Sequence, residues 1–346
     1  MARYDDASAG PLPAQSLASI RSWLSTASPL FILGDRTVGI GRTLILAAAG
    51  NKFLNHQASN RAFVKRAVRA FMPGEAPEDA LNAAQLLGKQ GRGTVFTKLG
   101  ENLTRPEEAD AVCDHYLNIF DQIKARGIVG HVSVKPTQLG LDLSQARCAE
   151  HLDVLGAKAM ATGSYLWIDM EDSSYVDRTL ELYEGLKRKH ERSGLALQAY
   201  LRRTPADIQR LLPLKPILRL VKGAYAEPAA VAFPVKADTD AAFFELSTIM
   251  LKAAAHGDCL PIFGTHDMGL IARIVARAKE LNVKDGQYEI HMLYGIRDGE
   301  QKQLVTEGHT VKTLVSYGNS WYKWYMRRLA ERPANVWFVV RSMFPA

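Results

Sequence analysis

One arginine stands inside an otherwise apolar run of the sequence. Arg219 is flanked by Leu218, Leu220 and Val221, so a strand at this position would carry a guanidinium group into the protein core. A buried cation is destabilising unless a carboxylate or a bound polar ligand compensates its charge. The pattern therefore favours a functional role for Arg219 over a structural one.

Two adjacent arginines follow an aromatic residue near the end of the sequence. Trp324 lies three and four positions before Arg327 and Arg328, so in a helix the ring and both guanidinium groups share one side. Adjacent arginines suit bidentate capture of a carboxylate, and the ring suits a flat or cyclic substrate. A surface helix with a basic outer face fits the same spacing equally well.

Several other residues, all but one of them polar, stand at the ends of apolar runs. They are Lys135, Asp169, Gln198, Lys222, Gly223, Tyr225, Thr265 and His266. Simpler structural explanations exist, with Lys135 as a solvated strand end and Asp169 as a helix cap. The His, Cys, Asp and Glu residues do not show the spacing of metal ligands, and we expect no metal site.

Eight short apolar runs must position these residues. They span residues 94–97, 131–135, 165–170, 195–200, 217–222, 261–265, 288–293 and 310–316. Segments with helical spacing, such as 177–192 and 270–281, lie between them. Alternating strands and helices with eight strands predict the α/β class and a (β/α)8 TIM-type barrel, whose active site surrounds the carboxyl ends of the strands.

A doubly wound open sheet is the competing fold. It would favour a glycine-rich first turn, and the only candidate, Gly39-Ile-Gly41, lacks the third glycine and precedes the strands. We therefore expect an N-terminal helical segment at residues 1–90 and a barrel with a C-terminal helix and tail at residues 91–346. A helix with an acidic first turn is expected over residues 75–87.

Residues 50–72 are the most basic part of the N-terminal segment. Five basic side chains and no acid occur there, and aromatic and alanine residues recur at helical spacing. Such an amphipathic helix can lie on an anionic membrane surface. A helix packed on the main domain with a solvated basic face is the commoner arrangement.

Composition excludes several classes of protein. The chain has 346 residues, of which 47% are hydrophobic and 23% charged, unlike disordered or fibrous proteins. Its longest apolar stretches, 44–49 and 336–340, are too short to span a membrane. Asp5 and Asp6 argue against a signal peptide, and three scattered cysteines fit a reducing compartment, so we expect a cytoplasmic protein. The net charge of +7 selects no partner.

The segments around these residues resemble the proline dehydrogenase family from about residue 66 to residue 340. Each motif is short, but their order and spacing are specific. The motifs are Leu99-Gly-Glu101, Ser133-Val-Lys135, Ile168-Asp-Met-Glu-Asp172, Gln198-Ala-Tyr200, Arg219-Leu-Val-Lys-Gly-Ala-Tyr225, Thr265-His266-Asp267, Met292-Leu-Tyr-Gly-Ile-Arg297 and Met326-Arg-Arg-Leu-Ala-Glu-Arg-Pro-Ala-Asn335.

The resemblance implies a (β/α)8 barrel that holds FAD without a covalent bond. Arg219 matches the arginine that hydrogen-bonds flavin N5. The other flavin-contacting positions are Gln198, Lys222, Gly223, Tyr225, Thr265 and His266. Lys135, Arg327 and Arg328 match the basic trio that holds the substrate carboxylate. Asp169 matches the carboxylate near the substrate amine, and Leu293 matches an apolar contact to the substrate ring.

The resemblance also implies a reaction. Hydride transfer from the proline carbon next to nitrogen to flavin N5 would give pyrroline-5-carboxylate, and the electrons would pass to a quinone at the membrane. The basic segment at residues 50–72 then offers a peripheral contact with the inner face of the membrane.

Three positions depart from the family pattern. Leu314 and Trp324 stand where tyrosines usually enclose the substrate ring, and Thr97 stands where an aspartate usually precedes the Leu-Gly-Glu motif. A pocket altered in this way can still accept proline at reduced affinity. The alternative substrate is a proline analogue or another cyclic or N-substituted amino acid.

Two other function classes compete with the flavoenzyme. A Schiff-base lyase or aldolase would use Lys135 or Lys222 as its nucleophile. A non-enzymatic protein would bind lipid or nucleic acid through residues 50–72, with a strong salt dependence. The ordered residues at the strand ends favour the flavoenzyme, and we expect no nucleic-acid partner.

Overall fold

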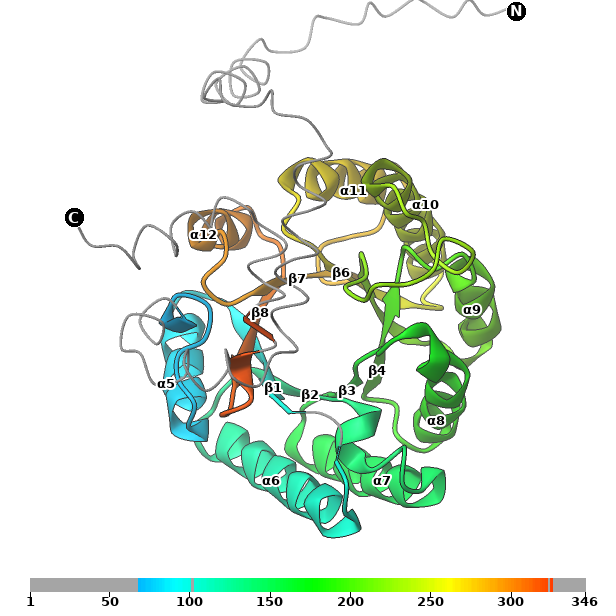
Figure 1. The fold of residues 1–346 in the computed structure, drawn as a ribbon. Helices are drawn as coiled ribbons and strands as arrows, with labels where there is room; N and C mark the ends of the chain where they lie inside the picture. The colour runs from blue at the N-terminus through cyan, green and yellow to red at the C-terminus, as the bar shows by residue number, and fades with distance from the viewer. Residues whose placement is uncertain (1–67, 101–102, 323, 326–346) are drawn as a thin grey trace, which may run out of the picture.

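The computed structural model describes residues 68–100, 103–322 and 324–325 of the chain. Eight parallel strands close into a barrel in chain order, with β1 paired to β8 (Figure 1). The strands are β1 (Gly93–Lys98), β2 (Gly130–Val134), β3 (Leu166–Ile168), β4 (Ser193–Gln198), β5 (Ile217–Val221), β6 (Leu260–Gly264), β7 (Glu289–Leu293) and β8 (Val311–Tyr317). The predicted barrel and all eight strands are confirmed, and the doubly wound sheet is excluded.

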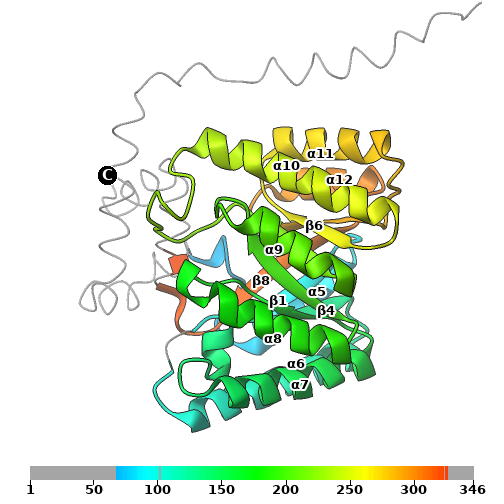
Figure 2. The same cartoon turned by 90° about the vertical axis from the view of Figure 1, so that its right-hand side faces the viewer.

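Helices cover the outside of the barrel (Figures 1 and 2). They are α5 (Pro77–Gly88), α6 (Pro106–Ala125), α7 (Gln145–Thr162), α8 (Val176–Lys189), α9 (Thr204–Leu211), α10 (Lys236–Ala255), α11 (Met268–Glu280) and α12 (Asp298–Thr306), with 3-10 turns η1 (Pro136–Leu139), η2 (Ser173–Tyr175) and η3 (Leu212–Leu214). The helix expected over residues 75–87 is α5, which packs on β1 and β8.

Side chains at alternate positions of each strand pack into two separate cores, one outside the barrel and one inside it. On β5, Leu218 and Leu220 join the large core between strands and helices, whereas Ile217 joins a cluster inside the barrel. Side chains alternate between the two faces of a strand, so Arg219 shares the inner face with Ile217. The sequence expectation that Arg219 enters the core is therefore confirmed, and the core is the barrel interior.

Several strands end earlier than the apolar runs predict. Residues 169–170 and 199–200 continue their runs and, apart from the half-buried Asp169, are buried, but they follow β3 and β4 instead of belonging to them. The apolar pattern indicates burial, and these residues lie in the connections at the carboxyl end. There the amides of Asp169, Ala199 and Tyr200 still donate to carbonyls of the neighbouring segments. Lys135, Asp169 and Lys222 therefore stand on the short segments directly after the strands, whereas Gln198 and Arg219 lie within β4 and β5.

Parts of the predicted organisation lie outside the described residues. These are nearly all of the basic segment at 50–72, most of the N-terminal segment 1–90, and the C-terminal helix with Arg327 and Arg328. The boundary near residue 90 stays a prediction. Among the described helices, we find none with the length and apolarity required to cross a membrane.

Candidate active site

Arg219 meets two polar side chains at the carboxyl end of the barrel. Its Nη2 donates to Ser133 Oγ at 3.0 Å and to a carboxylate oxygen of Asp169, which also accepts a 2.8 Å bond from Ser133 Oγ. Arg219 is 3% exposed, and burial lowers the pKa of its guanidinium while the charge of Asp169 opposes this shift. The carboxylate that a buried arginine requires is therefore Asp169, brought from β3 to β5 by barrel closure.

Two buried polar atoms on neighbouring strands lack a partner among the described residues. They are Arg219 Nη1, a donor, and Gln198 Oε1, an acceptor. The amide nitrogen of Gln198 is fixed, because it donates to the carbonyl oxygens of Met170 and Glu171 at 3.2 and 3.1 Å. Buried polar groups are nearly always paired in folded proteins. The two atoms therefore fit a ligand that offers both an acceptor and a donor.

Lys222 stands between two carboxylates directly after β5. Its Nζ donates to Asp240 on α10 and to Asp267 at 3.1 Å, and Asp267 caps α11 by accepting from the Leu270 amide. Burial tends to raise the pKa of Asp267, but the hydrogen bond and charge of Lys222 outweigh burial and lower it. The amine of Lys222 is engaged by both carboxylates, which disfavours its use as a Schiff-base nucleophile.

Gly223 comes directly after Lys222 and has a φ of +119°, a backbone conformation that favours glycine. A Cβ atom there would lie 2.3 Å from the ring of Tyr200. The chain after β5 therefore passes directly over this ring, and a side chain at 223 would force them apart.

The segment after β6 supports the neighbouring strand. Thr265 Oγ1 accepts from the amide of Asp267 at 3.2 Å, and His266 Nε2 accepts from the amide of Leu293 at 2.9 Å. The acceptor role leaves Nε2 unprotonated. Leu293 is paired in register with Leu314 of β8, so two leucines lie side by side at this part of the barrel.

Lys135 and Asp169 follow β2 and β3 directly, where the Asp169 amide donates to the Val134 carbonyl at 2.8 Å. Lys135 is half-buried and begins η1. Tyr225 and Trp324 are also described, whereas Arg327 and Arg328 lie outside the described residues. The convergence of the basic trio Lys135, Arg327 and Arg328 stays a prediction.

A second polar layer lies deeper in the barrel, toward the amino ends of the strands. Glu289 is ion-paired with Lys312 and accepts a hydrogen bond from His291 Nε2 at 2.9 Å, and all three side chains are largely buried. Burial lowers the pKa of His291 to about 4, although Glu289 opposes the shift. Burial also takes the pKa of His131 well below its usual value.

These two histidines make stability depend on pH. Both are neutral when folded but titrate near pH 6.5 when unfolded, so unfolding takes up protons as the pH falls from 6.5 toward 4. We expect the free energy of unfolding to fall by about 1.4 kcal/mol per pH unit for each histidine. Urea midpoints between about pH 7 and about pH 5 measure this.

The control for this pH dependence is an exposed histidine. His291→Gln is expected to flatten the slope by one proton, whereas His256→Gln, at the exposed end of α10, leaves it unchanged. A wild-type midpoint that stays constant or rises on acidification contradicts the buried neutral histidines.

Sequence reasoning missed Ser133 and Trp167 as members of the site. Ser133 carried a usable signal, because it lies two residues before Lys135 and shares a strand face with it. Trp167 resembled an ordinary apolar strand residue. Its ring centre lies 4.8 Å from the Cζ atom of Arg219. This contact depends on the stagger of β3 and β5, which both pair with β4.

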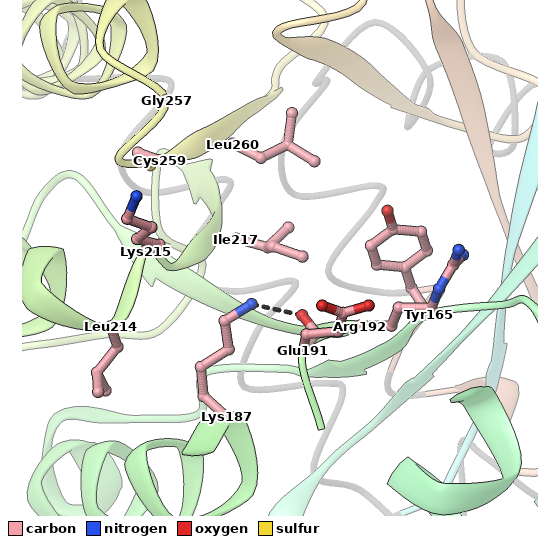
Figure 3. A pocket seen from close by; sticks show the side chains of 10 residues that line it. All are labelled: Tyr165, Lys187, Glu191, Arg192, Leu214, Lys215, Ile217, Gly257, Cys259 and Leu260. Atoms are coloured by element: carbon pink, nitrogen blue, oxygen red, sulfur yellow. Dashed lines mark hydrogen bonds between the residues drawn. The ribbon is translucent and has the colours of Figure 1, made fainter. Parts of the chain in front are cut away.

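A hollow of about 470 Å³ lies at the opposite end, lined by residues at the amino ends of β3 to β6 (Figure 3). Two of its cations are bound to backbone carbonyls: Lys187 donates to Glu191, and Arg192 to Gly163 at 2.8 Å. These bonds secure the connections between helices and strands. The hollow therefore belongs to the structural end of the barrel.

The fold and the site together are those of a (β/α)8-barrel enzyme with a buried arginine at its carboxyl end. The profile of the family described as "Proline dehydrogenase" matches residues 80–341. Proline dehydrogenase 1 of Bacillus subtilis (strain 168) is 36% identical over 303 residues, covering 87% of this chain and 98% of that protein. Proline dehydrogenase of Deinococcus radiodurans is 36% identical over 284 residues, covering 79% and 88%. The chain belongs to the proline dehydrogenase family.

A solved structure agrees on the fold. Proline utilization A from Bdellovibrio bacteriovorus, inactivated by N-propargylglycine, superposes with a TM-score of 0.71 at 23% identity over 84% of this chain. The match spans 35% of that protein, about a third of its length. Among the described residues, we find no group of three or more His, Cys, Asp or Glu side chains arranged to hold a metal ion.

Proposed function

We propose that this enzyme is FAD-dependent and oxidises L-proline to pyrroline-5-carboxylate, passing the electrons to a quinone. The observation that carries the proposal is the buried Nη1 of Arg219 at the carboxyl end of the barrel, which has no hydrogen-bond partner among the described residues. Family membership supports proline as the substrate. When bound, the flavin accepts the hydride, and the protein contributes positioning and electrostatics.

The described residues fit such a cofactor. Arg219 Nη1 supplies the donor for flavin N5, and Gln198 Oε1 supplies an acceptor for a ring N–H. The remaining proposed contacts come from Lys222, Gly223, Tyr225, Thr265 and His266. Lys222 is held by two aspartates, and His266 by a backbone amide, so both are fixed before a ligand binds.

We assign the substrate to the other residues that the family resemblance singles out. Lys135, Arg327 and Arg328 hold the carboxylate, and Asp169 faces the amine. Leu293 contacts the ring, and Leu314, its partner in register, extends this apolar wall. That wall favours, as a second candidate, a cyclic or N-substituted amino acid with more apolar surface than proline.

The quinone step would take place at a membrane surface. We propose a cytoplasmic protein with a peripheral contact on the inner face, made by the basic segment at residues 50–72. The support is the composition of that segment.

Flavin bleaching tests the proposed function. The purified protein is expected to be yellow, to lose its flavin absorbance when proline is added without oxygen, and to regain it with a soluble quinone. A panel of proline, hydroxyproline, pipecolate and N-methylproline ranks the substrates. A correctly folded protein that stays colourless after incubation with FAD contradicts the proposal.

A further inference from the structure

The indole of Trp167 lies directly beneath the buried guanidinium. The Cζ atom of Arg219 is 4.8 Å from the centre of the indole ring, and Trp167 is 1% exposed. A cation over the face of tryptophan is attracted most strongly where water is absent. The contact therefore acts on the Arg219 guanidinium, the group on which the proposed function is based.

The indole is itself fixed on its other sides. Its Nε1 donates to His131 Nδ1 at 3.2 Å, and His291 approaches edge-on with ring centres 5.6 Å apart. The ring also packs in the barrel interior with Val95, Ile217 and Ile262. The indole therefore cannot turn without breaking a buried hydrogen bond.

Gly194 on β4 provides the space for the ring. A Cβ atom at this position would lie 2.5 Å from the indole, and its backbone is not in the left-handed region, so the absence of a side chain is required by space alone. Two strands thus supply residues whose shapes match: a large ring on β3 and an empty position on β4.

Arg219 needs this support because its hydrogen bonds restrain only one end. Its bonds to Ser133 and Asp169 are both made by Nη2, while Nη1 has no partner among the described residues. A planar group held at one nitrogen can pivot about it. The flat face beneath limits that rotation.

We propose that Trp167 is a positioning residue that fixes the plane of the Arg219 guanidinium and so directs Nη1 at the cofactor ring. This inference rests on the proposed flavin site. A fixed cation next to the flavin stabilises the reduced, more negative form, so loosening the guanidinium lowers the reduction potential.

Three variants test the role of the ring. Trp167→Leu removes the aromatic face, Trp167→Phe keeps a face but removes the N–H, and Tyr165→Leu is the matched control. Tyr165 precedes Trp167 by two residues, and its described ring contacts are His131 and Arg192. The readout is the two-electron reduction potential of the bound flavin.

Trp167→Leu is expected to lower the equilibrium constant of flavin reduction at least tenfold, which corresponds to a fall in reduction potential of about 30 mV. Trp167→Phe and Tyr165→Leu are expected to stay within about threefold of wild type. Equal shifts for Trp167→Leu and Tyr165→Leu, or for Trp167→Leu and Trp167→Phe, overturn the proposal. If Trp167→Leu does not fold, Gly194→Ala, which displaces the ring, takes its place with the same expectation.

A measurement without flavin separates this inference from the proposed function. In a double-mutant cycle of Trp167→Leu and Arg219→Met on the apoprotein, the contact predicts that the two effects on the unfolding equilibrium constant are not additive. Additive effects overturn the inference. A wild-type protein that takes up no flavin, yet shows this coupling, refutes the proposed function and leaves the role of Trp167 in holding Arg219 intact.

Discussion

Arg219→Met is expected to lower kcat/KM for proline by about 10³-fold, the largest effect of any single substitution considered. The change removes the buried cation that we assign to the proposed cofactor and leaves Asp169 without its ion-pair partner. Removing one partner of a buried pair also destabilises the protein by about 3–5 kcal/mol. Steady-state kinetics with a soluble quinone and urea unfolding measure the two effects.

The matched control is Arg210→Met. Arg210 is also ion-paired, with Glu184 at 2.6 Å, but it lies on the outside of the barrel and is 41% exposed. We expect wild-type kinetics and a stability change below about 1 kcal/mol, as for other surface ion pairs. A kcat/KM of Arg219→Met within tenfold of this control contradicts the assigned role.

Arg327→Met and Arg328→Met are expected to raise KM for proline about 100-fold each while the flavin stays bound. Each removes one guanidinium of the proposed carboxylate trio, and losing such a charge-assisted contact costs about 2–5 kcal/mol. Absorbance spectra of the purified variants report flavin content, and kinetics report KM. Loss of flavin from both variants shows that these arginines hold the cofactor instead.

The sequence was sufficient to predict the barrel because each strand is recognisable from its own short apolar run. Runs such as 217–222 are buried on both faces, and helical spacing returns between them, so element type and order need no knowledge of long-range contacts. Arg219 was identified for the same reason: a charge inside an apolar run is visible without a structure.

The contacts of Arg219 could not be predicted from the residues alone. Asp169 and Ser133 lie 50 and 86 positions away, directly after β3 and on β2. Which inward-facing residues meet inside a closed barrel depends on strand stagger, and local periodicity carries no information about it. Trp167 was overlooked because an apolar pattern does not separate a residue that fills space from one that supports a charge.

The family resemblance supplied what the residues could not, and family membership is now established by the comparisons. It assigned roles to Lys135, Gln198 and His266, which spacing alone left open. The structure places these residues directly after β2, at the end of β4 and just beyond β6, all at the carboxyl end of the barrel. Their individual roles stay predictions.

The most direct measurement is a crystal structure of the FAD-loaded protein with a carboxylate analogue of proline that cannot be oxidised. We predict that Arg219 Nη1 donates to flavin N5 while Nη2 keeps Asp169, and that Lys135, Arg327 and Arg328 surround the ligand carboxylate. A flavin bound away from Arg219, or a carboxylate held by other residues, contradicts the account.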